Sequence, residues 1–261
     1  MSNYARCLAH IALHFKISPI YLNEEQVLNY LYYLRTQHNT PSKSFFKHTI
    51  YGLRYAFRMY GLKELRAALP SLEQPKKLPV VLSKREVKLF LKAPKCLKHR
   101  LVLGMLYGCG LRCFELCNIQ LKDLDFDREM LHVRQGKGRK DRYVPLSQML
   151  IRGLKKYIAT EHPTKWCFNG KNKKGNAVAL SRRGVQWIVR QTRERSGINK
   201  EITSHSLRHS YATHLLEMGL DIITIKDLLG HACIQSTIVY LNVAKLGRQR
   251  AFSPLDKLYS Q

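Results

Sequence analysis

The sequence is poor in acidic residues and has no long apolar run. Its 261 residues include 18 Asp and Glu against 45 Lys and Arg, which gives a formal net charge of +27 at pH 7. So many positive charges repel one another in a compact protein, so a polyanionic partner is expected. No apolar stretch approaches the roughly 20 residues of a membrane-spanning helix, and no signal-peptide pattern opens the chain. We therefore expect nucleic acid as the partner, no membrane association and a cytoplasmic location.

Patterns of metal ligands and disulfides are also missing. The seven cysteines include no Cys-x-x-Cys pair, and Cys109, Cys113 and Cys117 recur every four residues. That spacing places all three on one face of a helix as small packed residues, and it matches no usual zinc or iron–sulfur pattern. Reduced thiols are typical of an intracellular protein. No metal or other cofactor is expected.

Residues 1–72 are expected to form a small helical domain. Leu22–Gln37 contains Asn23 followed three residues later by Gln26, which is the signature of a capping box. A second helix is expected over Ser42–Met59, where apolar residues recur at helical spacing. The other faces of this helix are either a solvated surface or a DNA-contacting one, and they carry Lys43, Lys47, Arg54 and Arg58.

A linker and a larger domain follow. Ala68–Leu82 holds three prolines and little periodicity, which is typical of an extended linker; we place the linker at 73–82 and the second domain at 83–261. Ser83–Glu86 is another capping-box pattern that opens the first helix of this domain. Helices are expected over 83–93, 97–108, from 111 onward, and over 148–159, 181–195, 204–218, 221–229 and 234–246.

A β-hairpin is expected in the middle of the second domain. Met130–Gln135 and Arg142–Ser147 are strand-like and flank a basic, glycine-rich tip. Lys137 stands between two glycines at this tip, where a lysine could reach a DNA strand and donate a proton, or simply be solvated. Arg139 and Lys140 are further candidates for DNA contact. The fold class is therefore mainly α with a small β-hairpin or sheet.

Several residues have the chemistry needed to cleave a phosphodiester without a metal, which takes fixed cations, a nucleophile and a proton donor. Arg112 lies where a glycine-containing turn meets an apolar helix, and Glu115 on the same face could orient it. His205 and Arg208 are one helical turn apart. Each of these positions, taken alone, also has an ordinary structural interpretation.

Two further possibilities concern histidine and tyrosine. His205, His209 and His214 could form a metal site, although no His-Glu-x-x-His pattern accompanies them. Tyr240 follows His231 by nine residues, and a tyrosine at the end of an apolar run is usually a core residue. Its importance depends on the other motifs of the chain.

Four motifs follow one another along the second domain. They are Gly-Cys-Gly-Leu-Arg-Cys-Phe-Glu-Leu at 108–116, the Gly-Lys-Gly tip, His-Ser-Leu-Arg-His at 205–209, and Leu-Gly-His with a tyrosine nine residues later. Their order resembles the tyrosine recombinase family, the phage-integrase and Xer-type enzymes that cut and rejoin DNA at specific sites. The resemblance covers nearly all of 78–261. More weakly, the first 70 residues resemble the helical core-DNA-binding domain of that family, which implies two domains that together form a C-shaped clamp with an α+β catalytic domain.

The resemblance implies catalytic roles for six residues. Two arginines hold the scissile phosphate, a lysine protonates the leaving 5′-oxygen, one histidine handles protons at the nucleophile, another hydrogen-bonds the phosphate, and a tyrosine forms a 3′-phosphotyrosyl link without metal or ATP. In that order the matching positions are Arg112 and Arg208, Lys137, His205, His231 and Tyr240.

The resemblance also implies the assembly. Family enzymes act as homo-tetramers on two paired double-stranded DNA sites, and the segment after Tyr240 docks on a neighbouring protomer in many members, here with Phe252, Leu255 and Leu258 as apolar anchors; packing on its own subunit is the alternative. The expected function is integration, excision or resolution of DNA, including by a mobile element. The rival interpretations are a type IB topoisomerase, a non-catalytic DNA-binding regulator and, last, a metalloenzyme.

Overall fold

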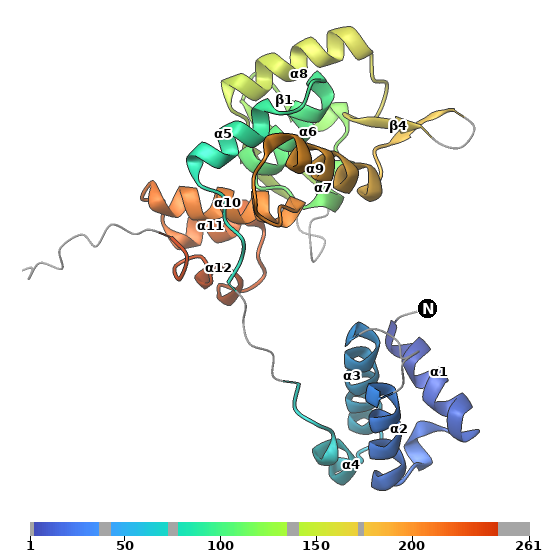
Figure 1. Cartoon of the computed structure of the whole chain (residues 1–261). Coiled ribbons are helices and arrows are strands. Elements are labelled where there is room, and N and C mark those ends of the chain that lie inside the picture. Colours follow the sequence, from blue (N-terminus) through green and yellow to red (C-terminus); the bar gives the residue numbers. More distant parts are fainter. Residues whose placement is uncertain (1–2, 37–42, 73–77, 135–140, 172–174, 245–261) are drawn as a thin grey trace, which may run out of the picture. The chain divides into compact units, whose positions relative to one another are not determined.

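The chain is organised into two compact units, and each has a hydrophobic core of its own. The computed structural model describes residues 3–36, 43–72, 78–134, 141–171 and 175–244. It divides into Met1–Lys76 and Lys77–Gln261, called here unit 1 and unit 2 (Figure 1). The fold is mainly helical with small antiparallel sheets, which confirms the expected fold class. Within the described ranges, no helix combines the length and apolar content that crossing a membrane requires.

Unit 1 is a set of helices packed around an apolar core. Its elements are α1 (Asn3–Phe15), η1 (Pro19–Tyr21), α2 (Glu24–Thr36), α3 (Lys43–Met59) and α4 (Lys63–Ala68). The capping box predicted for α2 is present, because Asn23 Oδ1 accepts the backbone N–H of Gln26 at 2.8 Å and Gln26 Oε1 accepts that of Asn23 at 3.0 Å. Ile50, Leu53 and Phe57 of α3 are fully buried in the core.

Unit 2 contains the remaining helices and all the described strands. In chain order it comprises α5 (Lys84–Lys92), α6 (Leu97–Gly108), α7 (Cys113–Cys117), η2 (Leu121–Asp123), β1 (Leu124–Asp125), β2 (Met130–Val133), β3 (Arg142–Pro145), α8 (Gln148–Glu161), β4 (Asn169–Lys171), β5 (Ala177–Ala179), α9 (Arg182–Ser196), α10 (Ser204–Glu217), α11 (Ile222–Leu229) and α12 (Gln235–Ile238).

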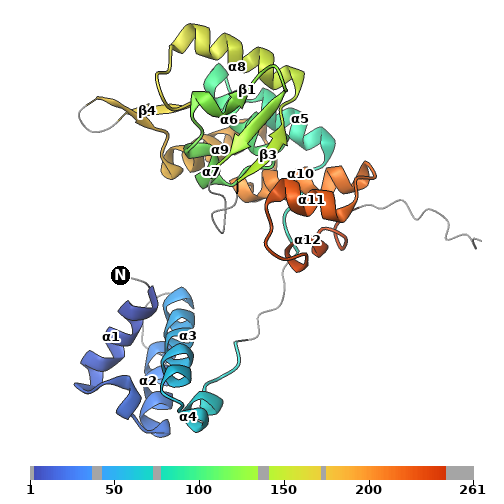
Figure 2. The same ribbon diagram turned by 180° about the vertical axis from the view of Figure 1, so that it is seen from behind.

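The predicted hairpin forms two strands of a three-stranded antiparallel sheet in the order β1-β2-β3 (Figure 2). Its register pairs Leu131 with Val144 and Val133 with Arg142. Side chains alternate between the two faces of a strand, so Arg142 shares the inward face with the fully buried Val144. The predicted tip, with its basic residues, lies outside the described residues.

Helix α10 is the central helix of unit 2. It packs against α6, α9 and α11, and most of its residues are buried on all sides, which is typical of an interior helix. Ser210 on α10 accepts the backbone N–H of Leu82 at 2.9 Å, which fixes the start of unit 2 against this helix. Most polar side chains on α10, Ser210 among them, are therefore held inside the unit, whereas that of His205 is exposed.

One prediction about local structure is wrong, and one element was not predicted. The helix expected over 234–246 is a single turn, α12, followed by turns in which Tyr240 N–H bonds Thr237 O and Leu241 N–H bonds Ile238 O, each at 3.0 Å. The run Ser-Thr-Ile-Val contains β-branched residues, whose χ1 restriction lowers helix propensity. The β4–β5 hairpin, which projects from unit 2 in Figure 1, was not expected either.

Replacing Ser83 by Ala should lower the free energy of unfolding of unit 2 by about 1 kcal/mol. Ser83 Oγ accepts the N–H of Glu86 at 3.2 Å, and Glu86 Oε2 accepts the N–H of Ser83 at 2.7 Å. Urea denaturation would measure the change, with Ser71→Ala, an exposed serine outside the helices, as the control. Equal effects of the two substitutions would contradict a capping role.

Candidate active site

A buried carboxylate lies at the centre of the candidate site. Arg112 precedes α7 and Glu115 lies in its first turn. Glu115 accepts the backbone N–H of Arg112 at 2.8 Å and its Nη1–H at 2.7 Å, and Glu115 is only 4% exposed. The short helix therefore fixes both the backbone and the guanidinium of Arg112.

Two more arginines reach the same carboxylate. Arg142 of β3 donates from Nη1 and Nη2 to the two Glu115 oxygens at 2.9 and 2.8 Å, a bidentate pair. Arg208 of α10 places Nη1 at 3.8 Å from Glu115 Oε2. Three guanidinium groups from distant segments thus converge on one carboxylate.

The carboxyl end of α11 supplies further acceptors, and Gly110 O also accepts Arg208 Nη1, at 2.5 Å. Three consecutive carbonyls receive one arginine each: Leu228 O accepts Arg142 Nε at 2.8 Å, Leu229 O accepts Arg208 Nη2 at 2.5 Å, and Gly230 O accepts Arg112 Nη2 at 3.0 Å. This is the negative end of the helix dipole, where cations are stabilised. The end of α11 therefore positions all three arginines.

Gly230 is the residue that permits this arrangement. It ends α11 with φ of 62°, in the left-handed region, where a residue without Cβ is favoured. A Cβ at this position would also lie 3.0 Å from Arg142 Nη1. The glycine of the Leu-Gly-His motif is thus explained by its left-handed backbone and by the close approach of the Arg142 side chain.

The site stays ionised and carries net positive charge. Burial alone would raise the pKa of Glu115, but the hydrogen bonds and charges of Arg142 and Arg112 outweigh it and hold that pKa at about 2. Burial lowers the pKa of Arg208 to about 10, which still leaves it protonated at pH 7. Three cations against one carboxylate give a formal charge of +2, suited to an anion.

Tyr240 lies beside these arginines in a small apolar cluster with Tyr211, Ile225 and Leu229. It is 2% exposed. Burial raises its pKa, and the charges of Arg208 and Arg112 oppose that rise only in part. The phenol is therefore protonated at pH 7 in the DNA-free protein.

Histidines flank the ring of Tyr240. His231 stacks on it with 6.4 Å between ring centroids and a 15° interplanar angle, and His231 Nδ1 lies 2.9 Å from Thr237 Oγ1. On another side, His209 Nδ1 lies 3.0 Å from Tyr240 Oη. Burial, reinforced by neighbouring Arg208, lowers the pKa of both histidines to about 4, so both rings are neutral at pH 7.

The structure brings together four of the six predicted catalytic residues. Arg112, Arg208, His231 and Tyr240 come from three separate regions of the chain and meet around α10 and α11. His205 is exposed on α10, one turn before His209, with 6.4 Å between the two ring centroids. The other predicted site residues at the hairpin tip, Lys137, Arg139 and Lys140, lie outside the described residues.

Sequence reasoning missed two residues of the site. Arg142 had a usable signal, since it stands two residues before an apolar strand position and so faces inward with it. His209 was considered only as a metal ligand. Its Nδ1 instead lies against Tyr240, while His214 Nδ1 lies 2.9 Å from Tyr107 Oη. Across the part of the chain that the structure describes, no group of three or more His, Cys, Asp and Glu is arranged to hold a metal.

A basic cleft of about 650 Å³ borders the site. Its charged lining comprises Arg112, Arg182, Arg190 and Arg193, with Glu201 paired to Arg193 at 2.6 Å, and His205 of α10 also borders it. Arg182 and Arg190 are exposed. The cleft therefore extends the positive charge of the site over the surface of unit 2.

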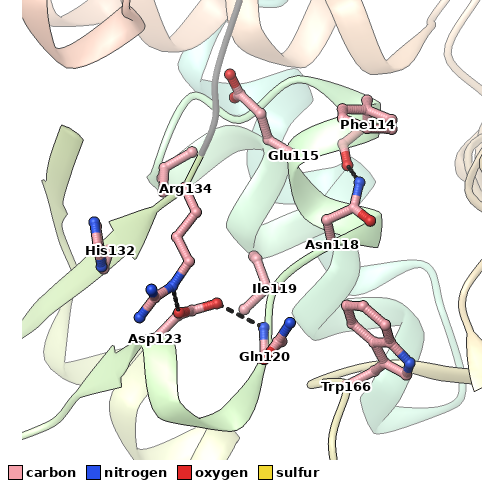
Figure 3. A pocket seen from close by; sticks show the side chains of 10 residues that line it. Phe114, Glu115, Asn118, Ile119, Gln120, Asp123, His132, Arg134 and Trp166 are labelled. Carbon is pink, nitrogen blue, oxygen red and sulfur yellow. Dashed lines mark hydrogen bonds and ion pairs between the residues drawn. The ribbon is translucent and has the colours of Figure 1, made fainter. Parts of the chain in front are cut away.

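A second pocket, of about 270 Å³, is lined by residues of α7, η2 and β2 (Figure 3). Asp123, 3% exposed, pairs here with Arg134 and accepts the N–H of Gln120 at 2.9 Å. Figure 3 shows the Glu115 side chain directed away from this ion pair. The Asp123–Arg134 pair thus anchors the end of β2, just before the hairpin tip, independently of the arginine site.

The basic candidates of unit 1 differ in their surroundings. Arg58 is exposed and Lys47 partly buried. Arg54 Nη2 donates to Pro70 O at 2.8 Å, so this arginine holds the chain that leaves unit 1. The side chain of Lys43 lies outside the described part of the structure.

Comparison with known proteins gives consistent matches. The family described as "Phage integrase family" matches residues 80–246. Tyrosine recombinase XerA of Thermococcus kodakarensis (strain ATCC BAA-918 / JCM 12380 / KOD1) is 36% identical over 224 residues, 85% of this chain and 78% of that protein. A tyrosine recombinase of Pseudothermotoga lettingae (strain ATCC BAA-301 / DSM 14385 / NBRC 107922 / TMO) is 34% identical over 248 residues, 92% of this chain and 82% of that protein.

Solved structures match over most of the chain. The crystal structure of XerA recombinase aligns with a TM-score of 0.58 and 25% identity, covering 91% of this chain and 84% of that one. The Tn1549 transposon integrase in complex with transposon right end DNA aligns with a TM-score of 0.67 and 17% identity, covering 91% and 87%. The second likeness shows the fold alone.

Replacing Glu115 by Gln should destabilise unit 2 by about 3–5 kcal/mol at pH 7, because it leaves buried guanidinium groups without their counter-charge. The folded pKa of about 2 lies below the ordinary 4.5, so the carboxylate contributes about 3 kcal/mol above pH 4.5, and this contribution is lost as pH falls toward 2. Urea denaturation from pH 7 to 2 would measure both effects.

The control for this experiment is Glu161→Gln at the exposed end of α8. We expect the Glu115 variant to lose less stability than wild type between pH 5 and 2, whereas the control should follow wild type. A wild-type acid profile in the Glu115 variant would contradict the assigned role of this carboxylate.

Proposed function

The chain belongs to the phage integrase family, the tyrosine recombinases, and is a site-specific recombinase; from this premise we propose that it cleaves and rejoins DNA through a 3′-phosphotyrosyl link at Tyr240. The observation that carries the proposal is the position of this buried phenol beside Arg112 and Arg208. The cations and the nucleophile come from segments far apart in the sequence, yet they border one site.

The arginines suit the scissile phosphate. Arg112 and Arg208 would bind its non-bridging oxygens, because planar guanidinium groups match phosphate geometry. They are already fixed by Glu115 and by the end of α11. Donors held in place before reaction stabilise the charge that develops in the transition state without reorganising. His231 would add a hydrogen bond to the phosphate.

The cleavage step needs neither ATP nor a metal. Tyr240 Oη forms a bond to phosphorus while the bond from phosphorus to the 5′-oxygen breaks, and that oxygen takes a proton from Lys137. The family resemblance implies that His205 takes part in the proton transfers around the nucleophile. The covalent link conserves the energy of the broken bond, so a 5′-hydroxyl of a second DNA end can reverse the step and complete the exchange.

The partner would be double-stranded DNA with a specific site, bound by a homo-tetramer on two paired sites. The basic cleft of unit 2 and the exposed cations of unit 1, such as Arg58, are the candidate DNA contacts. Related structures include XerH site-specific recombinase bound to difH substrate. Integration, excision or resolution would be the outcome. Topoisomerase and purely regulatory functions are not favoured, because the relatives are recombinases.

Replacing Tyr240 by Phe should abolish the covalent adduct and leave DNA affinity within about twofold, because only the nucleophilic hydroxyl is removed. The protein would be incubated with nicked genomic fragments in EDTA and the trapped DNA sequenced, which also reports the site. As a matched control, Tyr211→Phe alters a neighbouring buried tyrosine and should keep the adduct. A Mg²⁺ requirement, or an adduct that survives in the Tyr240 variant, would contradict the proposal.

DNA affinity should fall steeply with salt. Each phosphate contact releases counterions, and 6–10 contacts would weaken binding by roughly 10³–10⁵ between 50 and 200 mM salt. Fluorescence anisotropy on the recovered site would measure the slope. Arg190→Gln in the cleft should reduce the magnitude of the slope of log affinity against log salt concentration by about one. A flat salt response would argue against an electrostatic DNA interface.

A further inference from the structure

His209 makes the direct contact to the hydroxyl of Tyr240. It follows Arg208 on α10, is partly buried, and places Nδ1 at 3.0 Å from the phenol oxygen with 5.6 Å between ring centroids. The other flanking histidine, His231, has its Nδ1 engaged with Thr237 and stacks on the face of the tyrosine ring. The two imidazoles therefore meet the phenol in different ways.

The direction of this hydrogen bond follows from burial. The phenol has one proton to donate, and among the described residues His209 Nδ1 is the hydrogen-bond partner of Tyr240 Oη. If Nδ1–H were the donor, the buried phenol proton would lack an acceptor, which costs about 1–3 kcal/mol. Because the His209 ring is neutral at pH 7, its bare Nδ1 can accept the phenol proton.

We infer that His209 is a further catalytic residue, the group that takes the proton directly from Tyr240 during cleavage, in addition to the proton-handling role that the family resemblance implies for the neighbouring His205. The inference rests on the proposed function of Tyr240 as nucleophile. As Tyr240 Oη bonds to phosphorus, its proton moves to His209 Nδ1 and gives an imidazolium; the bond from phosphorus to the 5′-oxygen breaks, and that oxygen is protonated separately by Lys137. The reverse step returns the proton from His209 to the phenol oxygen.

The surroundings of His209 fit this task once DNA is bound. Burial, with His205 and Arg208 nearby, lowers its pKa to about 4 in the DNA-free protein, so the ring starts unprotonated. A phosphodiester anion bound by the adjacent arginines would stabilise the imidazolium and raise that pKa toward neutrality, where a general base is most effective. The exposed His205 lies one turn away and has no such contact with Tyr240 among the described residues.

The test compares His209→Asn and His209→Ala with wild type on a nicked duplex that carries the site recovered from wild-type adducts. Asn can keep a hydrogen bond near the Nδ1 position but cannot take a proton. We expect both variants to form the adduct at least about a hundredfold more slowly, with DNA affinity within about twofold. Added imidazole should restore part of the rate to the Ala variant. His99→Asn, a partly buried histidine beside Trp187, is the control and should react like wild type.

A second substrate separates the nucleophile from the leaving group. With sulfur in place of the bridging 5′-oxygen, the leaving thiolate needs no proton. The rate of adduct formation should therefore recover in Lys137→Ala but not in the His209 variants. A His209→Asn rate within about threefold of wild type, or rescue of that variant by the sulfur substrate, would overturn the inference. If wild type forms the adduct and Tyr240→Phe does not, the proposed function holds, whatever the result for the His209 variants. Thermal unfolding of each variant shows whether it folds normally. If the Ala variant has a folding defect, the adduct rate of an Asn variant that unfolds like wild type decides the question.

Discussion

The burial of positive charge is the constraint on which unit 2 depends. Arg208 is 3% exposed, and a buried guanidinium without partners would cost several kcal/mol. The chain meets this cost with one carboxylate, Glu115, and with the successive carbonyls that end α11. A shift of either element would leave cations unpaired, so the geometry of the phosphate site and the stability of the fold have the same origin.

The same packing determines the environment of Tyr240, the proposed nucleophile. Tyr240 lies within an apolar cluster, protonated and nearly inaccessible, so the free protein protects its hydroxyl from adventitious reaction. The turns that follow α12 direct it inward, where cations and neutral histidines surround it. In the proposed mechanism its reactivity depends on a bound phosphate that changes the electrostatics of its neighbours. The proposed nucleophile thus lies among core residues, and this explains why the sequence pattern around it resembles that of a core residue.

Local patterns predicted much of the fold. The capping residues Asn23 and Ser83 mark helix starts that the structure contains, because a cap depends only on groups within one turn. The hairpin was predicted from two strand-like segments, Met130–Gln135 and Arg142–Ser147, on either side of a glycine-rich tip. The turn at Tyr240 was mistaken for helix, since an apolar run of β-branched residues does not reveal whether tertiary packing will end the helix early. Arg142 was overlooked because its importance comes from a carboxylate 27 residues away.

By itself, the sequence determined the charge, the capped helix starts at Asn23 and Ser83, and the order of motifs that identifies the family, because these depend on composition and on neighbours along the chain. Only the tertiary structure decided that Glu115 serves three arginines, that α11 ends against them, and that His209 rather than an exposed histidine contacts Tyr240. Those relations join residues from distant segments, and they exist only where burial forces each polar group to find a partner.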